Sequence, residues 1–563
     1  MSQINLNSLS VNELKILNKI NLSINKDFLK LIDQIYKDTD NSIDWLTNSV
    51  LSRDIHLSSI YIDLCYIELV KQIVKKNKIK KIIAQNYAQK KVLEDKFPNL
   101  EIVSKSIIFS KINNLSFFLK GLFKNIFYSF KLLLVKSEVR KSEVLRKKGI
   151  SLLDIFFIPS MFKNNTYQER YYPGFLESIK NKHKDKIYFF PNILYLKNIS
   201  KSLKIANQSK KNFVFNFDFL KFSDYLYAIF SFLRIRKINF YKYTFRGSKI
   251  GPILKNDFDK NLTNFSSFLG LLNYRFFKQA KNSDLDLRLV INWFENQVVD
   301  RGFNKGKNVF YPKIESKGFV GYLNAFDYVF HYAPSKTEYI TKVLPDKILV
   351  TGKKIIKKIR KNCPNLKVIT APAYRNNYLF LKSKIKKKNK KKKQILVLLN
   401  GSFEESLNIM NSVLKFEKHF PKEILAIKIK PHQALDVNLM KKKLPKLPNR
   451  FIFIKGNLDK IIKNFDLTIS NFSTVCIESI IYGVPAIIAG SKKNITASPI
   501  PNNLSKKMWN VCYSSTEYID AINNFCFSNI NFQKKYIKIS NDLKNSYFNE
   551  VTERKTLSFL NLV

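Results

Sequence analysis

The sequence predicts an α/β protein of two domains, each built on a parallel sheet, that face each other across a central cleft. In both halves of the chain, short apolar runs that end in turns alternate with segments of helical apolar spacing. Strands that alternate with helices in this way form parallel sheets. A lysine-rich run at residues 382–394, which cannot be buried, separates the two patterns. The length of 563 residues suffices for two such domains with insertions.

The first half begins with a polar, helical stretch at residues 1–50 and then carries the apolar runs of a sheet. Four segments are expected to form buried strands: KIKKIIAQN, SLLDIFFIPS, KIYFFPNI and DLRLVINWF. We therefore expect residues 1–375 to form the first, acceptor-side domain, with helical insertions. Residues 376–394 are expected to be a solvated basic linker.

The second half repeats the alternation without a break. Its predicted strands are ILVLLN, EILAIKIKPH, FDLTIS and PAIIAG, and helices are expected between them. We expect residues 395–525 to form the second, donor-side domain. Residues 526–563 are predicted to be C-terminal helices, which can pack back on the first domain. In parallel sheets of this kind ligands bind at the carboxyl ends of the strands.

The charge of the chain is strongly positive, with a formal net value of +55 from 98 basic and 43 acidic residues. Such a charge suits a nucleic-acid-binding protein, which we keep as an alternative function. However, Lys, Asn, Ile and Phe are abundant along the whole chain, as an AT-rich genome would produce, and the lysines are spread over many segments. We therefore expect no specific nucleic-acid partner. Nucleotides, acidic glycans and anionic membranes are attracted by the same field.

The five cysteines lie far apart and form no CxxC pair, so the sequence predicts neither a disulfide framework nor a zinc site. The first residues, MSQINLNSLSVNELK, lack a basic start followed by an apolar run, and no apolar stretch reaches about 18 residues. These features predict a cytoplasmic protein, and its charge would allow association with the inner face of the cytoplasmic membrane.

One long segment, residues 115–148, is both basic and apolar. Lys120, Lys124 and Lys131 can share one face of a helix in this segment. Two interpretations remain open. The segment is either an amphipathic helix that lies at a membrane interface, or a helix packed on the sheet with a solvated lysine edge.

The most informative segment of the second half is FDLTISNFSTVCIESIIYG. A buried strand is expected to end at Ser470, and a hydroxyl-rich turn leads into a helix. Ser473 and Thr474 offer hydroxyl donors beside the unpaired N–H groups of the first helical turn, which together favour a phosphate. Glu478 follows one turn later and is a candidate for binding a ribose diol. The structural alternative is that Ser473 only caps the helix.

Two further strand ends carry candidate donor-binding residues. The strand IKIK ends in Lys430, and His432 follows after a proline, where an imidazole can donate to a phosphate oxygen. Gly401 and Ser402 follow the strand ILVLLN, where glycine allows a close backbone approach. All of these residues are expected at the same edge of one sheet.

The candidate base lies in the first half, after the strand LRLVINWF. Glu295 and Asp300 are carboxylates beyond a strand end that should face the cleft, so either can remove a proton from an acceptor hydroxyl. Asp300 is slightly favoured, because Glu295 lies closer to the rigid strand. Arg301 is expected to bind a donor phosphate or a carboxylated sugar, or to pair with Asp300.

These motifs resemble known families. The KPH segment and the SNFST turn are similar to the K-P-H-P and serine motifs of bacterial sialyltransferases and Kdo transferases, with Gln433 in place of the second proline. Residues 293–352 resemble the surface carbohydrate biosynthesis proteins of bacterial polysaccharide gene clusters. The matching positions are Trp293 to Gln297, Asp300 to Gly302, Gly318 to Gly321, and Pro334 to Glu338.

The resemblance implies a GT-B glycosyltransferase with two Rossmann-like domains. Such an enzyme would move a sugar from a nucleotide-sugar donor to a surface polysaccharide (capsule or O-antigen) or lipid-linked glycan. If the resemblance extends to the substrate, the donor is CMP-linked, and UDP- and CDP-linked donors remain open. A CDP-polyol phosphotransferase of the same fold is an alternative. No resident cofactor is expected, and no acidic or His/Cys cluster has metal-ligand spacing at a strand end, so metal-independent transfer is predicted.

Overall fold

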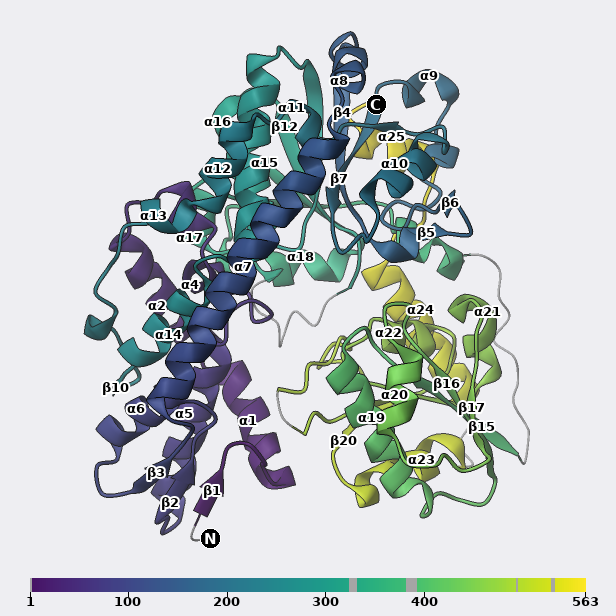
Figure 1. Ribbon diagram of the computed structural model, residues 1–563. Coiled ribbons are helices and arrows are strands. Elements are labelled where there is room, and N and C mark those ends of the chain that lie inside the picture. Colours follow the sequence, from purple (N-terminus) through teal and green to yellow (C-terminus); the bar gives the residue numbers. More distant parts are fainter. Residues whose placement is uncertain (1–2, 324–331, 381–391, 493–494, 528–531) are drawn as a thin grey trace.

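The computed structural model describes residues 3–323, 332–380, 392–492, 495–527 and 532–563. Within these residues the chain forms two large parallel sheets and a smaller N-terminal one, each with helices packed on it (Figure 1). The first large sheet lies in the upper part of Figure 1, the small sheet at its lower left, and the second large sheet at its lower right. The predicted α/β class is confirmed.

The first large sheet has seven strands in the described part of the chain, and all of its pairings are parallel. In order across the sheet they are β14 (Lys367–Thr370), β13 (Lys347–Val350), β12 (Glu315–Val320), β11 (Leu287–Trp293), β4 (Ile150–Phe157), β7 (Ile187–Ile193) and β8 (Asn212–Phe213). Counted along the chain from β4, the order 3-2-1-4-5-6 is that of a Rossmann domain, and β14 extends it by one strand.

Helices and a short hairpin surround this sheet. The helices are α7 (Ile107–Val135), α8 (Glu138–Leu145), α9 (Asn181–Lys184), α10 (Ile199–Asn207), α11 (Asn216–Phe219), α12 (Phe222–Ile229), α13 (Ser231–Arg234), α15 (Phe265–Asn282), α16 (Val298–Phe310), α17 (Lys336–Ile340) and α18 (Lys353–Ile359). β5 (Phe162–Lys163) and β6 (Thr166–Tyr167) form a hairpin beside this sheet, whereas the hairpin of β9 (Thr244–Phe245) and β10 (Ser248–Lys249) lies in the N-terminal region, whose separate core includes Phe245. β4 is buried along its whole length, as expected for a central parallel strand covered on both faces.

The second large sheet has six described strands, all parallel. Their order across the sheet is β17 (Phe451–Phe453), β16 (Ile424–Lys430), β15 (Lys393–Leu398), β18 (Leu467–Ser470), β19 (Ala486–Ala489) and β20 (Trp509–Cys512). Counted from β15, this is again the Rossmann order 3-2-1-4-5-6. The chain therefore has two Rossmann-like domains, which is the predicted GT-B architecture.

Alternate residues of the central strand show that both faces of the second sheet are buried. Ile395 and Val397 pack into one core, and Leu396 and Leu398 into another. The helices around the sheet are α19 (Phe403–Glu417), α20 (Val437–Lys443), α21 (Leu458–Ile461), α22 (Val475–Ile481) and α23 (Ser515–Cys526). The continuous apolar run in the sequence therefore reflects burial on both sides, not an edge strand.

The N-terminal region has a core of its own, separate from that of the first large sheet. Its small parallel sheet consists of β1 (Gln3–Asn5), β2 (Lys81–Ile83) and β3 (Glu101–Val103). The helices around it are α1 (Val11–Ser23), α2 (Asn25–Lys37), α3 (Ile43–Leu46), α4 (Ser49–Ser52), α5 (Ile60–Lys76), α6 (Tyr87–Lys96) and α14 (Gly251–Asn261). The region also touches the second domain, because the backbone N–H of Thr496 donates to Asn18 Oδ1 at 2.8 Å and Lys15 pairs with Glu517 at 2.5 Å.

The C-terminal helices α24 (Phe532–Tyr547) and α25 (Glu553–Phe559) return to the first domain. Thr351 Oγ1 donates to the carbonyl of Tyr547 at 3.0 Å, and Phe559 lies in the core of the first sheet. Arg288 Nη1 donates to the carbonyl of Leu560 at 3.1 Å. The outward connection follows η6 (Tyr374–Phe380), and most of the predicted basic linker, residues 381–391, lies outside the described residues.

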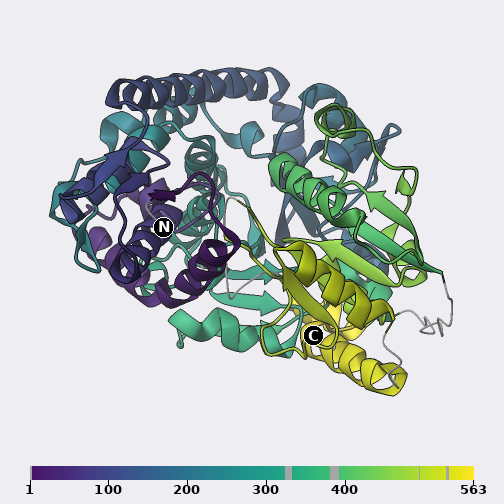
Figure 2. The same cartoon turned by 90° about the horizontal axis from the view of Figure 1, so that it is seen from below.

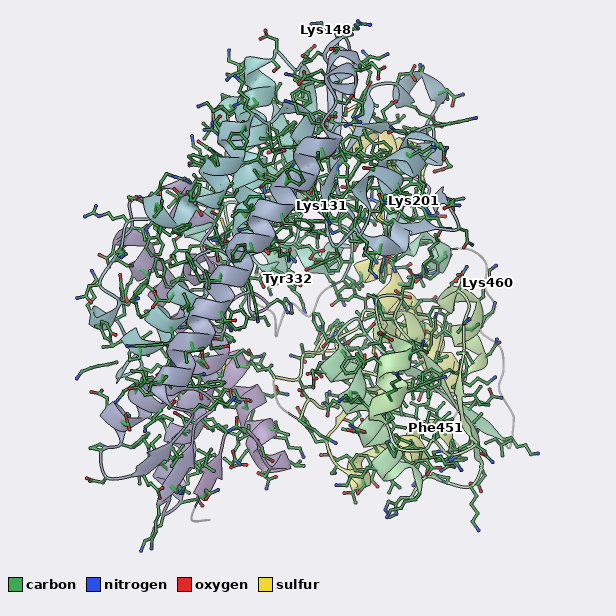
Figure 3. All side chains as sticks on the ribbon, in the orientation of Figure 1. Lys131, Lys148, Lys201, Tyr332, Phe451 and Lys460 are labelled. Atoms are coloured by element: carbon green, nitrogen blue, oxygen red, sulfur yellow. The ribbon has the colours of Figure 1, made fainter. Side chains whose placement is uncertain are left out.

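The positive side chains are spread over the surface. Lys131, Lys148 and Lys201 lie on different elements of the first domain and Lys460 on the second (Figure 3). In the part of the chain that the structure describes, none of the helices combines the length and the apolar character that a membrane span requires.

Candidate functional site

The carboxyl ends of β15, β16 and β18 bring three of the predicted donor segments together. A Cβ placed on Gly401 would lie 3.3 Å from Nδ1 of His432, so glycine lets the loop after β15 pass close to the imidazole. Asn400 Nδ2 donates to Asn471 Oδ1 at 2.8 Å, which joins the loops after β15 and β18. Ser402 is exposed and caps α19 by accepting from the backbone N–H of Glu405.

Three cationic side chains, Arg170, Arg375 and Lys430, lie near His432 beside this edge and come from both domains. Burial lowers the pKa of His432, and the charges of Arg170, Arg375 and Lys430 lower it further. The pKa of Arg170 is likewise lowered by burial and then by Arg375. Burial and the charge of Lys163, in the first domain, lower the pKa of Lys430. All four side chains are half-buried. Burial and neighbouring positive charges thus lower the pKa values of Arg170, Lys430 and His432, which makes this edge a candidate site for an anion.

Arg375 is the central member of this cationic group, which we define as Arg170, Arg375, Lys430 and His432. It lies in η6, and its guanidinium is 5.8 Å from the centroid of the Trp293 ring. Burial raises the pKa of Glu295 in the first domain and of Glu478 in the second, and the charge of Arg375 opposes both increases. Sequence reasoning missed Arg170 and Arg375, because each is a lone arginine in an irregular segment and no motif marks it.

Glu295 lies beside the cationic group, half-buried, after the carboxyl end of β11. Its Oε1 accepts from Trp293 Nε1 at 2.9 Å, and its Oε2 accepts from Gln297 Nε2 at 2.7 Å. Burial raises the pKa of this carboxyl, although hydrogen bonds from Trp293 and Tyr322 and the charge of Arg375 act in the opposite direction. Glu295 is thus a carboxylate whose orientation is fixed by two hydrogen bonds and whose pKa is raised by burial.

The preference for Asp300 as the base is corrected by the structure. Asp300 is 1% exposed, and its Oδ2 accepts from the backbone N–H groups of Glu295 and Gln297 at 2.9 and 3.0 Å. It is the third residue of α16 and forms a capping box with Gln297. Burial raises its pKa to about 7. A carboxylate enclosed in this way positions the loop that carries Glu295 and cannot reach an acceptor.

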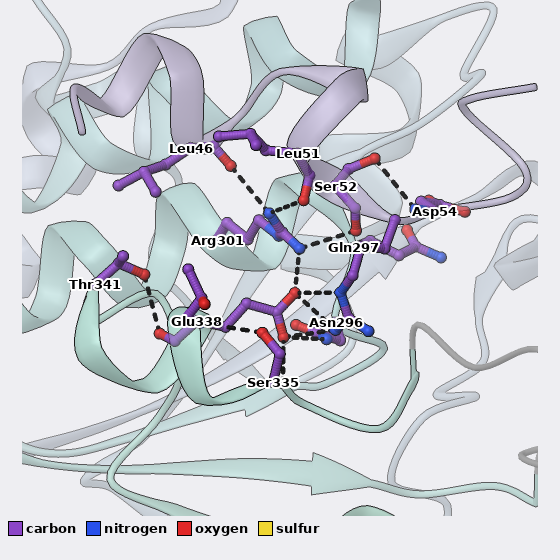
Figure 4. A network of polar contacts seen from close by, with 12 residues as sticks. Leu46, Leu51, Ser52, Asp54, Asn296, Gln297, Arg301, Ser335, Glu338 and Thr341 are labelled. Atoms are coloured by element: carbon purple, nitrogen blue, oxygen red, sulfur yellow. Dashed lines mark hydrogen bonds and ion pairs between the residues drawn. The ribbon is translucent and has the colours of Figure 1, made fainter. Parts of the chain in front are cut away.

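Arg301 also differs from its expected role in donor binding. It is 2% exposed, and it pairs with Glu338 instead of Asp300 (Figure 4). Its guanidinium donates to the carbonyls of Leu51 and Ser52 at 2.9 and 2.8 Å. With every described contact inside the protein, Arg301 is a structural cation.

Glu338 is the centre of this buried network. Besides Arg301 it holds Arg53, whose Nη2 is 2.7 Å from Glu338 Oε2, and it accepts from Asn296 Nδ2 at 3.1 Å. The pKa of Glu338 is lowered by the two arginines, which outweigh its burial. The blocks around Trp293–Gly302 and Pro334–Glu338 therefore meet and join the N-terminal region to the first sheet.

The serine turn contributes less than the sequence predicts. Ser470 is fully buried, and its hydroxyl donates to the carbonyl of Leu398 at 2.9 Å, which removes it from the candidate donor contacts. The backbone N–H of Ser473 donates to the carbonyl of Asn471 at 2.7 Å, and Thr474 makes no side-chain cap. Ser473 and Thr474 stay half-buried at the start of the seven-residue helix α22.

Glu478 is not placed for ribose binding. It is 7% exposed, and its carboxylate accepts from Asn376 Nδ2 at 3.2 Å and from the Tyr378 hydroxyl at 2.5 Å. Both partners belong to η6, the segment that carries Arg375. Glu478 thus attaches this segment to α22, which holds Arg375 between the domains. Burial raises the pKa of Glu478.

Among the described residues no group of three or more His, Cys, Asp or Glu side chains is arranged to hold a metal ion.

Comparisons with known proteins give similarity in structure only. No family model matches the chain, and no curated protein matches it in sequence. Among solved structures it is similar to the S. aureus MnaA–UDP complex, with 12% identity, a TM-score of 0.43, and coverage of 74% of this chain and 98% of that one. The lipopolysaccharide outer core galactosyltransferase WaaB aligns at 11% identity and a TM-score of 0.41, over 74% and 100% of the two chains.

A third similar structure is the UDP-GlcNAc 2-epimerase of Neisseria meningitidis bound to UDP-GlcNAc. Its identity is 13% and its TM-score 0.40, over 73% of this chain and 99% of that one. The two Rossmann strand orders, and not these similarities, establish the architecture of the present chain.

Proposed function

We propose that this protein is a glycosyltransferase that binds a nucleotide-sugar between its two domains and transfers the sugar to a glycan acceptor. The cationic group carries this proposal. Arg170 and Arg375 belong to the first-domain side, Lys430 and His432 to the second, and in the described residues none of the four forms an ion pair. Unpaired, half-buried charges of one sign are costly unless an anion joins them.

The phosphate of the donor would lie within the cationic group. Arginine binds phosphate oxygens through two parallel N–H groups, and the lysine and the protonated histidine add charge. Ser473 and Thr474 border the same sheet edge and can add hydroxyl donors. The same cations would stabilise the negative charge that develops on the leaving nucleotide, so no metal ion is required.

Glu295 would remove the proton from the attacking hydroxyl of the acceptor. It lies beside Arg375 and therefore near the anomeric carbon of a donor whose phosphate occupies the cationic group. Its raised pKa increases its basicity, and Trp293 and Gln297 fix its orientation. Asp300 would act indirectly, because it accepts a hydrogen bond from the backbone N–H of Glu295 and so positions that residue.

The substrates are proposed only as classes. A CMP-, UDP- or CDP-linked sugar fits the site as donor, and a surface polysaccharide or lipid-linked glycan at the inner membrane face is the proposed acceptor. A CDP-polyol phosphotransferase would use the same phosphate site but would release a phosphodiester product. Mass spectrometry of the product distinguishes the two.

Thermal-shift measurements with CMP, UDP, GDP and CDP test the proposal. We expect at least one nucleotide to raise the melting temperature of the wild type, and His432→Ala and Arg375→Ala to abolish the shift. His419→Ala and Arg360→Ala remove the same side chains at exposed sites of the second domain and the first domain, and should behave like the wild type. Equal shifts in all variants would refute the site. Tight generic DNA binding without any nucleotide effect would favour the nucleic-acid alternative.

A further inference from the structure

Helix α7 has an inverted distribution of polarity. Of its 29 residues, all of which the structure describes, the buried ones are Asn125, Ser129 and Leu132. Large apolar side chains on the same helix are exposed to solvent, namely Ile107, Ile108, Phe109, Ile112, Leu115, Phe117, Leu119, Phe123, Ile126, Phe127, Phe130 and Leu134. A helix that packs on a soluble domain shows the opposite pattern. The helix does pack on the first domain, through Leu132 and the half-buried Leu122, Tyr128 and Leu133, but its exposed edge is largely apolar and is not the solvated lysine edge of the second interpretation.

The exposed apolar side chains form one continuous stripe. Positions 108, 112, 115, 119, 123, 126, 130 and 134 recur at intervals of three or four residues, which places them on one side of the helix. Ile112, Phe123 and Phe130 are 62%, 66% and 57% exposed. The stripe spans about 40 Å at 1.5 Å per residue.

The surface around the stripe is apolar as well. α7 contacts α12, and Phe118 packs edge-on against Phe232 of α13 at 5.2 Å. Phe222 and Leu233 on these two helices are 63% and 72% exposed. Figure 2 shows α7 along the outer edge of the molecule, at the top of that view, with no other element outside it. We call α7 with the exposed side chains of α12 and α13 the α7 face.

The charge of α7 indicates what covers this face. Residues 107–135 contain Lys111, Lys120, Lys124 and Lys131 and no acidic residue. A second copy of the chain docked on the same face would bring these lysines together, at an energetic cost. A bilayer with anionic headgroups offers the complementary charge and an apolar layer for the stripe.

We propose that the α7 face docks the protein on an anionic lipid bilayer, with the helix lying in the interface and its lysines at the headgroups. Four lysines along the helix are incompatible with its insertion across the hydrocarbon layer, because each would have to be buried there. The proposal goes beyond the proposed function and does not require it, since the α7 face contains none of the cationic group.

Co-sedimentation with vesicles tests the docking. We expect the wild type to pellet with phosphatidylglycerol vesicles at low salt and only weakly with pure phosphatidylcholine. Ile112→Glu/Phe123→Glu/Phe130→Glu should lower the partition coefficient roughly tenfold or more. The matched control Ile340→Glu/Leu425→Glu/Leu439→Glu makes the same charge change at side chains that are 62%, 47% and 46% exposed, and should retain most of the binding.

Two further measurements help to interpret the vesicle assay. Circular dichroism shows whether each variant is folded, and the nucleotide thermal shift shows whether the proposed donor site is intact, independently of lipid. Equal vesicle binding by both triple variants would overturn the proposal, as would a wild type that ignores anionic vesicles at low salt. A wild-type dimer that only the α7 variant dissociates, together with no vesicle binding, would assign the face to a second copy.

Discussion

Two charge-rich regions of this protein differ in one respect: the Glu338 network lies in the first domain, and the cationic group is formed by residues of both domains. Around Glu338 each carboxylate and guanidinium has a partner inside the protein, and Arg53, Arg301 and Glu338 are almost completely buried. In the cationic group the side chains are half-buried, and burial together with neighbouring positive charges lowers the pKa values of Arg170 and His432. Charged side chains that form ion pairs within the protein contribute to the fold, whereas charged side chains without such a partner at a domain interface are candidates for binding a ligand.

The sequence motifs point to the Glu338 region as the functional one, whereas the structure makes the cationic group the better candidate for binding a ligand. The blocks around Trp293–Gly302 and Pro334–Glu338 are the most specific motifs, yet most of their polar atoms hold the protein together. Glu295 is the exception, since it reaches the edge of the cationic group. Arg170 and Arg375 belong to no motif, yet they are the first-domain cations that influence the pKa of His432 in the second domain.

The largest expected effect is on turnover, and it distinguishes Glu295 from Asp300, the two carboxylates that the sequence offers as the base. Glu295→Gln should lower turnover about 10²–10⁴-fold, the usual effect of losing a general base, and leave nucleotide affinity nearly unchanged. Steady-state kinetics and nucleotide titration measure the two quantities. Glu404→Gln, an exposed glutamate of α19, is the control. Near-normal turnover in Glu295→Gln would place the base elsewhere, and a matching loss of affinity would place Glu295 in the donor site.

The next effect concerns the paired region. Glu338→Gln leaves Arg53 and Arg301 without their shared counter-charge in a buried site, and should lower the free energy of unfolding by about 3–5 kcal/mol. Urea denaturation measures this change. Glu94→Gln breaks only exposed pairs with Lys90 and Lys91 and should cost less than about 1 kcal/mol. Equal stability of the two variants would show that the Glu338 network does not hold the fold.

Asp300→Asn should act on stability instead of turnover. In the folded protein the pKa of Asp300 is raised to about 7 from an ordinary value of 3.8. The folded state therefore binds more protons than the unfolded state between these values, and stability falls as the pH rises through this window. Asparagine keeps the acceptor oxygen and removes the titration, so the stability of the variant should depend less on pH between 4 and 8. A loss of turnover as large as in Glu295→Gln would restore Asp300 as the base.

A smaller effect links the cationic group to pH. In the free protein the pKa of His432 lies below its ordinary value of 6.5, because of burial and of Arg170, Arg375 and Lys430. A bound phosphate favours the protonated imidazole, so nucleotide binding should take up a proton and become roughly two- to tenfold tighter from pH 8 to pH 6. Isothermal titration in buffers of different ionisation enthalpy measures the proton uptake. A pH-independent affinity in the wild type would contradict this assignment.

The last prediction is that removal of metal ions has no effect on turnover. If the cationic group neutralises the leaving nucleotide, EDTA should leave turnover unchanged within about twofold. Assays with and without EDTA, on protein passed over a chelating resin, measure this. Loss of activity with EDTA and its rescue by magnesium or manganese would show that the four cations do not suffice.

The sequence predicts much of this protein because local patterns determine much of it. βαβ spacing leads to parallel sheets, and parallel sheets bring the ends of β15, β16 and β18 to one edge. Gly401, His432 and the serine turn could therefore be placed near one another from sequence. The exposed stripe of α7 also follows from its periodicity, although which side of the helix faces solvent does not.

Only the tertiary structure decided which charges are paired. Arg301 and Glu338 are separated by 37 positions, and their ion pair depends on how α17 packs against α16. Arg375 reaches His432 and Glu295 because Asn376 and Tyr378 attach η6 to Glu478 and because α25 returns the chain to the first domain. The energy of a charge depends on its solvent exposure and on the sign of its neighbours, and long-range packing determines both.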